Sequence, residues 1–195
     1  IDDWHTSGLR ATGSKTVVVD DVFVPEHRTH KMSDGFRQES PGHEANKAPL
    51  FRLPFGQIFT RSVATPAIGM AIGALEAYKE VTSKRVGRAD GRKVVEDPTS
   101  TEVYAVAALA IDEARTILYR DYEEMMAHVR SGQKITMEDR VRYRYNSSIA
   151  TDKCVRAVDE LFTTSGGGAI FLASKINRFF QDIHAARGHF ANNPN

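Results

Sequence analysis

The residues best suited to chemistry gather at the end of the chain. His184 and His189 stand five positions apart, and Asn192 and Asn193 follow them. An imidazole can donate or accept a proton at neutral pH, because its ordinary pKa is about 6.5. This pattern predicts an acid–base or hydrogen-bonding group, with His189 as the first candidate and His184 as the second, unless both sit on a solvated helix end. The two asparagines either reach a ligand or cap the preceding helix.

A run of three glycines precedes these histidines. Gly166, Gly167 and Gly168 follow Ser165 directly, and they remove side chains where the backbone must approach something closely. The run is not a P-loop, because no Gly-Lys-Ser/Thr follows it. Two explanations remain open, which are a close approach to a cofactor and a tight turn between two helices.

Other common chemistries find no support in the sequence. His27 and His30 are spaced i, i+3, but no Glu-x-x-His motif accompanies them, which disfavours a di-iron bundle. Cys154 is the single cysteine, so a disulfide framework and a cysteine-ligated metal site are excluded. A Gly-x-Ser-x-Gly motif is also absent. We therefore predict no metal site, and we expect Cys154 to be a small buried apolar residue.

Charge and composition narrow the class of protein. The 195 residues carry 26 Lys and Arg against 25 Asp and Glu, and no apolar run appears long enough to span a membrane. We therefore expect no nucleic-acid and no membrane partner. One short basic cluster is either a solvated helix end or an anion contact; it comprises Arg85, Arg88, Arg92 and Lys93. The chain begins at Ile1 and shows no signal peptide, so we expect a cytoplasmic protein whose N-terminal part precedes this sequence.

The first third of the chain indicates β structure followed by a linker. Residues 16–19 and 22–24 are rich in β-branched and aromatic side chains, and Pro25 ends the second run. Two such strands need a larger sheet to be stable. We expect residues 1–35 to be part of a β domain, and residues 36–55 to be a linker because prolines and glycines interrupt any periodicity.

The rest of the chain predicts helices that would position the candidate residues. Apolar side chains recur every three to four positions, and we read their stripes as core. We expect a capping box from Thr99 to Glu102, and a cap at Thr136 supported by Asp139. The four expected helices run from about Thr60 to Gly87, Pro98 to Gly132, Thr136 to Thr164, and Ser174 to Arg187. Short connections between them predict an antiparallel four-helix bundle over residues 56–195.

In the last of these helices, Arg178 and Asp182 stand at i, i+4 and so share one face. Opposite charges at this spacing can pair on a helix surface. We expect a structural ion pair here.

These residues also carry a resemblance to a known family. Trp4, the run from Gly8 to Ser14, and the run from Val17 to Glu26 resemble the end of the middle β domain in the acyl-CoA dehydrogenase superfamily. Leu161-Phe162, Gly166-Gly167 and the run from Arg178 to Asp182 resemble the last part of its C-terminal bundle. The resemblance implies a mainly α fold, in which the four-helix bundle follows the last strands of the middle β-barrel domain.

Two chemistries compete within that superfamily. Dehydrogenases that oxidise acyl-CoA carry a catalytic Glu about eight residues after the matching Arg-Asp motif, where this chain has His189-Phe190. No acidic residue follows Asp182, and proton abstraction beside a thioester needs a placed base. The tail from His184 to Pro194 instead resembles the two-component flavin-dependent aromatic hydroxylases, which include 4-hydroxyphenylacetate and secosteroid-phenol hydroxylases.

This second resemblance implies the oxygenase component of a flavin-dependent monooxygenase. A separate NAD(P)H:flavin reductase would supply reduced FMN or FAD, and molecular oxygen would form a C4a-hydroperoxide that hydroxylates a phenolic ring. It further implies a homo-oligomer, expected to be a tetramer, with His189 and His184 as catalytic residues. The implied flavin contacts are Gly166, Gly167, Gly168, Asn192, Asn193 and, at a phosphate, Arg85. The alternatives are an acyl-CoA dehydrogenase-type flavoenzyme and a non-catalytic helical oligomerisation module.

Overall fold

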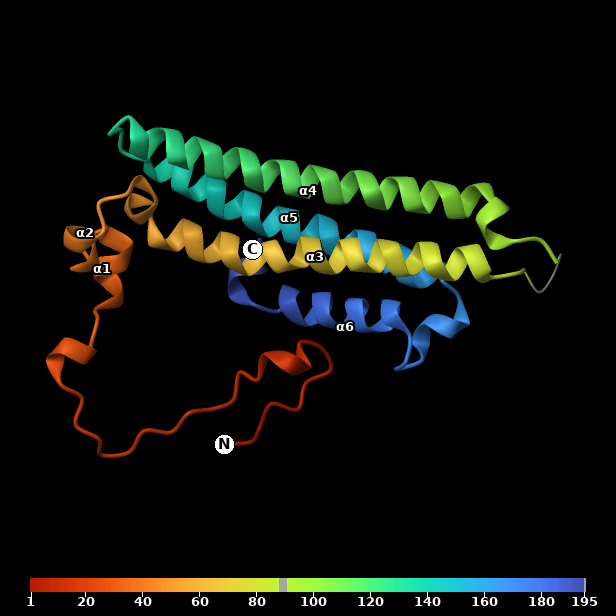
Figure 1. The fold of residues 1–195 in the computed structure, drawn as a ribbon, viewed down its shortest axis with the longest axis horizontal. Coiled ribbons are helices and arrows are strands. Elements are labelled where there is room, and N and C mark those ends of the chain that lie inside the picture. The colour runs from red at the N-terminus through yellow and green to blue at the C-terminus, as the bar shows by residue number, and fades with distance from the viewer. Residues whose placement is uncertain (88–90, 195) are drawn as a thin grey trace.

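The computed structural model describes residues 1–87 and 91–194, and it is an elongated antiparallel bundle with an N-terminal segment running beside it (Figure 1). The bundle helices are α3 (Phe55–Lys84), α4 (Pro98–Arg130), α5 (Met137–Thr164) and α6 (Lys175–Arg187). Two shorter helices precede them, α1 (Met32–Arg37) and α2 (Gly42–Ala45). The expectation of four bundle helices is therefore confirmed.

Small residues let α3 pack closely against its neighbours. Its alanines recur every three to four positions on one face, and all of them are buried against α4, α5 and α6. At Gly73 a Cβ atom would lie 2.3 Å from Cζ of Phe179, so α6 can approach only because position 73 has no side chain. From α5, Cys154 and Leu161 reach the same core with no exposed surface. The buried alanines of α3 are Ala64, Ala67, Ala71, Ala74 and Ala77.

The absence of a membrane-length apolar run, expected from the sequence, does not hold for α3. By length and composition alone, this helix is apolar enough to cross a membrane. The alanine face of α3 is buried against three other bundle helices, while only 28% of its most apolar 18-residue stretch is buried in this chain.

Side-chain caps fix where two of the helices begin. Thr136 caps α5 as predicted, since its Oγ1 accepts a hydrogen bond of 3.1 Å from the Asp139 N–H. The predicted cap at Thr99 is wrong, because the N-cap of α4 is Asp97, whose Oδ1 accepts from the Thr99 N–H at 3.0 Å. Pro98 occupies the first position of α4, where a backbone N–H would have no partner within the helix, so proline is well suited there. The helix therefore starts earlier than the capping box predicts.

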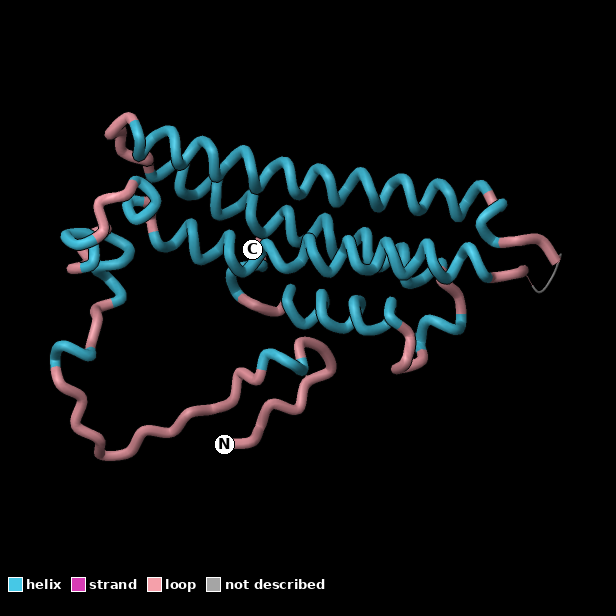
Figure 2. Tube along the Cα trace, in the orientation of Figure 1, coloured by secondary structure: helices cyan, strands magenta, loops and turns pink. Residues whose placement is uncertain are grey.

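The strands predicted in residues 16–24 do not form. Among the described residues no strand is present, and the first thirty residues are loop with two short 3₁₀ turns (Figure 2). Val17 is 83% exposed and Phe23 is 86% exposed. A strand needs a neighbour to complete its hydrogen bonds, and this extended segment has none among the described residues. The prediction of β structure for 1–35 is therefore corrected for this chain.

The N-terminal segment docks on α6 through a close backbone approach. A Cβ atom at Gly8 would lie 2.0 Å from the carbonyl oxygen of Gln181, and the Leu9 N–H donates to Asp182 Oδ1 at 2.7 Å. The predicted Arg178–Asp182 ion pair is wrong, because Asp182 accepts from Leu9 while the Arg178 guanidinium lies 5.1 Å from the Phe179 ring centroid.

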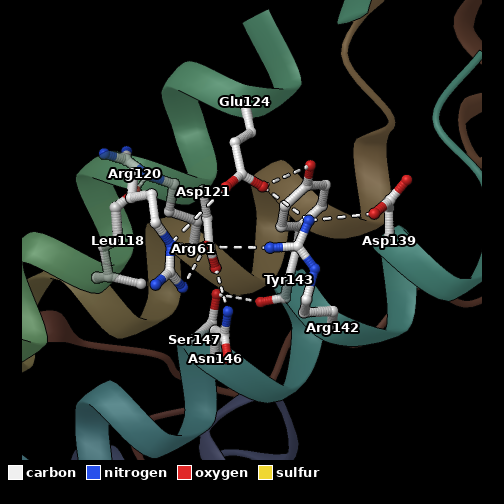
Figure 3. A network of polar contacts seen from close by, with 10 residues as sticks. All are labelled: Arg61, Leu118, Arg120, Asp121, Glu124, Asp139, Arg142, Tyr143, Asn146 and Ser147. Atoms are coloured by element: carbon white, nitrogen blue, oxygen red, sulfur yellow. Dashed lines mark hydrogen bonds and ion pairs between the residues drawn. The ribbon is translucent and has the colours of Figure 1, made fainter.

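A polar network joins α4 to α5 and sets their register (Figure 3). The buried Asp121 accepts from Asn146 Nδ2 at 2.8 Å, and Arg142 Nη2 contacts Glu124 at 2.7 Å and Asp139 at 3.1 Å. The hydrogen bond from Arg142 is the main reason that the pKa of Glu124 lies below its usual value. Burial raises the pKa of Tyr143, which also contacts Glu124, to about 12. These contacts make the α4–α5 hairpin a fixed platform for the tail described below.

Candidate functional site

His189 lies in a short tail that follows α6. The tail ends in a 3₁₀ turn, η6 (Phe190–Asn192), which His189 caps: its Nδ1 accepts a hydrogen bond of 3.1 Å from the Ala191 N–H. A neutral imidazole that accepts at Nδ1 carries its hydrogen on Nε2. No described residue contacts this Nε2 through a hydrogen bond, so the half-buried ring presents a donor to whatever occupies the adjoining space.

Two side chains, the half-buried Arg144 and the buried Asn192, hold the tail on α5. Arg144 reaches across and donates 2.8 Å hydrogen bonds to the carbonyl oxygens of Phe190 and Ala191. Asn192 is fully buried, where its Oδ1 accepts from the Thr151 hydroxyl at 3.2 Å and its Nδ2 donates to the Ala186 carbonyl at 2.8 Å. These contacts fix the backbone on both sides of His189, so the position of its ring is set in advance.

A series of aromatic rings leads up to His189. We call Phe36, Phe55, Phe59 and Phe190 the aromatic row; they come from α1, α3 and the tail. Neighbouring ring centroids are 5.5 Å apart for Phe36–Phe55, 5.8 Å for Phe55–Phe59 and 5.9 Å for Phe59–Phe190. The His189 ring lies 4.7 Å from Phe190 and 5.9 Å from Phe59. Such a surface can stack a planar aromatic ligand next to a hydrogen-bond donor.

Three rings of the aromatic row remain accessible in this chain. Phe36, Phe55 and Phe190 are 47%, 42% and 68% exposed, so the row is a surface and not part of the bundle core. Exposed apolar side chains that lie next to one another often mark a binding surface. The aromatic row and Arg144 were missed in the sequence, although Phe55 and Phe59 at i, i+4 on the first bundle helix were a usable signal.

His184 occupies a different place, on the side of α6 that faces α5. Its Nε2 lies 2.7 Å from Asp159 Oδ1, and its ring centroid lies 4.5 Å from that of Phe180. The imidazole and the carboxylate are both well exposed, at 39% and 41% of their side-chain surface. A carboxylate partner at this distance orients the imidazole ring. The two candidate histidines therefore belong to separate environments.

Arg85 and the glycine run meet at the other end of α6. Arg85 Nη1 donates to the Ser165 carbonyl at 2.9 Å and to the Thr164 carbonyl at 3.3 Å. Gly166 has φ 75° and ψ −176°, and a Cβ atom there would lie 2.6 Å from the Arg85 guanidinium. Cβ atoms at Gly167 and Gly168 would have open space within 4 Å. This turn therefore offers a cation beside exposed backbone, while Arg88 of the same basic cluster lies outside the described residues.

The predicted cofactor contacts consequently form two groups. One group is Arg85 with the glycines, and the other is the tail; α6, with its 13 residues, separates them by about 20 Å. Within the tail, Asn192 uses its side chain to cap α6 and hold Thr151, which matches the capping explanation. Asn193 is exposed, and its carbonyl oxygen accepts from Arg144 at 3.3 Å. In the part of the chain that the structure describes, no group of three His, Cys, Asp or Glu side chains is placed to hold a metal ion.

A known protein family matches most of this chain. Residues 62–194 match the family described as acyl-CoA dehydrogenase, C-terminal domain. The chain belongs to this family. The matched range contains α4, α5, α6, the tail and all but the first turns of α3, so the family resemblance read from the glycine run and the last helix is confirmed.

Individual relatives of this acyl-CoA dehydrogenase-type chain carry oxygenase names. A flavin-dependent monooxygenase, oxygenase subunit HsaA, from Rhodococcus jostii (strain RHA1) is 39% identical over all of the chain and 51% of its own length. The crystal structure of 3-HSA hydroxylase from Rhodococcus sp. RHA1 superposes with a TM-score of 0.92 at 38% identity, covering the whole chain and 50% of that protein. XiaF from Streptomyces sp., solved with FADH2 and glycerol, gives a TM-score of 0.85 at 25% identity over the whole chain and 49% of that protein.

These matches place the chain as a relative of flavin-dependent monooxygenase oxygenase subunits. The chain spans about half the length of the relatives it matches. The activity, substrate and partners of a whole protein are therefore matters for proposal.

Proposed function

We propose that this chain forms the C-terminal part of the oxygenase component of a two-component flavin-dependent monooxygenase that hydroxylates a phenolic substrate. One observation carries the proposal: an imidazole whose tautomer is fixed by a backbone hydrogen bond lies at the end of an exposed aromatic row. A planar phenol needs both features, since its ring stacks on aromatic faces and its oxygen accepts a hydrogen bond.

The residues present fit a flavin. Its isoalloxazine ring is flat and aromatic, which suits the aromatic row, and its phosphate suits Arg85 beside the open backbone of Gly167 and Gly168. Because α6 separates these groups, we propose a homo-oligomer in which the glycine turn of one subunit serves a flavin whose ring lies against the tail of another. When bound in the reduced form delivered by a separate reductase, FMN or FAD supplies the oxygen activation and transfer.

His189 then acts on the substrate oxygen as a donor. The substrate would bind as its phenolate, after its proton has passed to bulk water, and the His189 Nε2–H would donate to the phenolate oxygen and stabilise its negative charge. Taking up a proton at Nδ1 would break the bond from the Ala191 N–H, so His189 is better suited to donation than to acting as a base. Arg144 keeps the tail in place, and the aromatic row excludes water from the ring that reacts.

Asp159 makes His184 the second candidate. An imidazole 2.7 Å from a carboxylate can take up a proton as a general base. It would become the leading candidate if the substrate approached α6 from the α5 side instead of the α3 side.

The acyl-CoA dehydrogenase reaction has less support. It needs a carboxylate base near the flavin, whereas no acidic residue follows Asp182 and Asp182 is occupied by the Leu9 N–H. The third possibility, a non-catalytic assembly module, assigns no role to the tautomer of His189 or to the accessible aromatic row.

The test uses the full-length protein with a generic flavin reductase, oxygen and a panel of phenols. We expect His189→Ala to lower the formation of hydroxylated product at least about tenfold while reduced flavin still binds. His184→Ala is the matched comparison, and His27→Ala, at an exposed residue outside both the tail and the aromatic row, is the control.

Three results would contradict the assignment. Wild-type product formation in His189→Ala with loss in His184→Ala would move the role to the His184–Asp159 pair. Reduction of a bound flavin by an acyl-CoA would support a dehydrogenase. If the full-length protein bound no flavin, the non-catalytic assembly module would be the remaining explanation.

A further inference from the structure

A second concave site lies between α1, the 3₁₀ turn η3 (Pro49–Arg52) and the hairpin that joins α4 to α5. Its volume is about 350 Å³. Four of its lining side chains are cationic, namely Arg37, Arg52, Lys134 and Arg140. No acidic side chain among the described residues lines this hollow, which we call the basic pocket.

The positive charge of the basic pocket is not compensated within the chain. Arg37, Arg52 and Lys134 form no ion pair with any described residue, and Arg140 is bound only through a neutral amide, by donating to Gln38 Oε1 at 3.3 Å. Arg142, two positions further along α5, differs from Arg140 because it contacts both Glu124 and Asp139. The whole chain has a formal net charge of +1, so four converging cations are a local feature and not a result of composition.

The pocket walls are held in place by specific contacts. Gln38 adopts a left-handed backbone conformation, with φ 63°, and its amide nitrogen donates to the Arg52 carbonyl while its amide oxygen accepts from Arg140. Gln57 Nε2 donates to the Arg140 carbonyl at 3.2 Å, which ties α3 to the same turn of α5. A left-handed conformation is costly for a residue other than glycine, and surrounding contacts must maintain it.

Like charges held together in a hollow repel one another, and an anion relieves that repulsion. Guanidinium groups match tetrahedral oxoanions geometrically, because two parallel N–H donors can engage two oxygens. We propose that the basic pocket binds a phosphate-type oxoanion, either free phosphate or the phosphomonoester of a nucleotide. This site goes beyond the oxygenase reaction, since filling it requires neither a reduced flavin nor turnover.

The test is a calorimetric titration of the full chain with inorganic phosphate at low chloride concentration. We expect a phosphate site whose affinity falls at least about tenfold in Lys134→Gln and in Arg140→Gln, as for the loss of one charge-assisted contact, and stays unchanged in Arg85→Gln at the glycine turn. Lys134 is exposed and Arg140 is tied to Gln38, so the lysine variant tests the site even if the arginine variant folds poorly. Arg130→Gln is the control, because Arg130 is exposed nearby at the end of α4 but does not line the pocket.

A second titration distinguishes the two sources of the anion. FMN binding at least about tenfold tighter than phosphate, with the same loss in Lys134→Gln and with riboflavin unaffected, would identify a nucleotide phosphomonoester. Phosphate binding with FMN no tighter would identify the free ion. The proposal is overturned if no phosphate binds at millimolar concentration, or if Arg130→Gln weakens binding as much as Lys134→Gln does.

Discussion

At both ends of α6 an arginine holds the adjoining loop in place, but the two loops expose different groups. At each end, one arginine from a neighbouring helix binds two successive carbonyl oxygens of the adjoining loop: Arg85 binds Thr164 and Ser165, and Arg144 binds Phe190 and Ala191. The glycine end gains an exposed backbone with no side chains, whereas the tail end gains a fixed side chain, His189. The same type of contact can therefore prepare a surface for a ligand or place a functional group.

The largest difference between the two ends should appear in stability. Asn192→Ala removes a fully buried amide and leaves the Ala186 carbonyl and the Thr151 hydroxyl without their partner. We expect a loss of about 3 kcal/mol in the free energy of unfolding, measured by urea denaturation. Asn46→Ala is the matched control, since Asn46 is exposed on α2's end, and it should change stability by less than about 0.5 kcal/mol. If both variants lowered the free energy of unfolding by the same small amount, the side chain of Asn192 would not stabilise the bundle.

The glycine end should respond to the addition of a single methyl group. Gly166→Ala places a Cβ atom against the Arg85 guanidinium in a conformation that suits only glycine, so we expect a loss of about 2 kcal/mol. Gly167→Ala is the control, because its Cβ would meet open space, and stability should stay within about 0.5 kcal/mol of wild type. If the two alanine variants unfolded at the same urea concentration, Arg85 would not be packed on Gly166.

Arg144→Lys tests whether the tail stays in place only when both the Phe190 and the Ala191 carbonyl oxygens are bound. Lysine keeps the charge but lacks the planar fork that spans Phe190 and Ala191. We expect about tenfold faster amide hydrogen exchange at Asn192, corresponding to roughly 1 kcal/mol of local stability, with little change in global unfolding. Unchanged exchange at this amide would mean that Asn192 alone fixes the tail.

The α4–α5 network lies away from the glycine end and provides a pH-dependent reference. The folded-state pKa of Glu124 is lowered from 4.5, chiefly by the hydrogen bond from Arg142, so its stabilising effect is present above that value and is lost as the pH falls. We expect the stability difference between wild type and Glu124→Gln to be largest near pH 6 and to shrink below about pH 4.5. Glu123→Gln, at an exposed neighbour outside the network, is the control. A difference that does not change with pH would exclude ionisation of Glu124 as its source.

The bundle was predictable because its signals are local. Apolar periodicity located all four helices, and the Thr136–Asp139 cap was read correctly because an N-cap depends on residues three apart. The strand prediction failed at Val17 and Phe23 because β propensity describes a side chain that suits a sheet, while a strand also requires a partner distant in sequence.

The candidate site was predictable in part. Histidines and glycines were noticeable as residue types, but their grouping depends on which helices pack together. Nothing near Arg85 in the sequence indicates that it will cover Gly166, 81 positions later, and nothing near Asp182 indicates that Leu9 will displace Arg178 as its partner. Contacts between distant segments decide the site, and they become visible only when the bundle has formed.

The buried Cys154 has a practical consequence for studying these contacts. Burial raises the pKa of its thiol to about 12, so the sulfur stays protonated and shielded while α5 is packed in the bundle core. As the chain contains this one cysteine, alkylating reagents can label only molecules in which α5 has come away from its neighbours. The rate of that labelling would follow opening of the bundle at one known point, without any engineered probe.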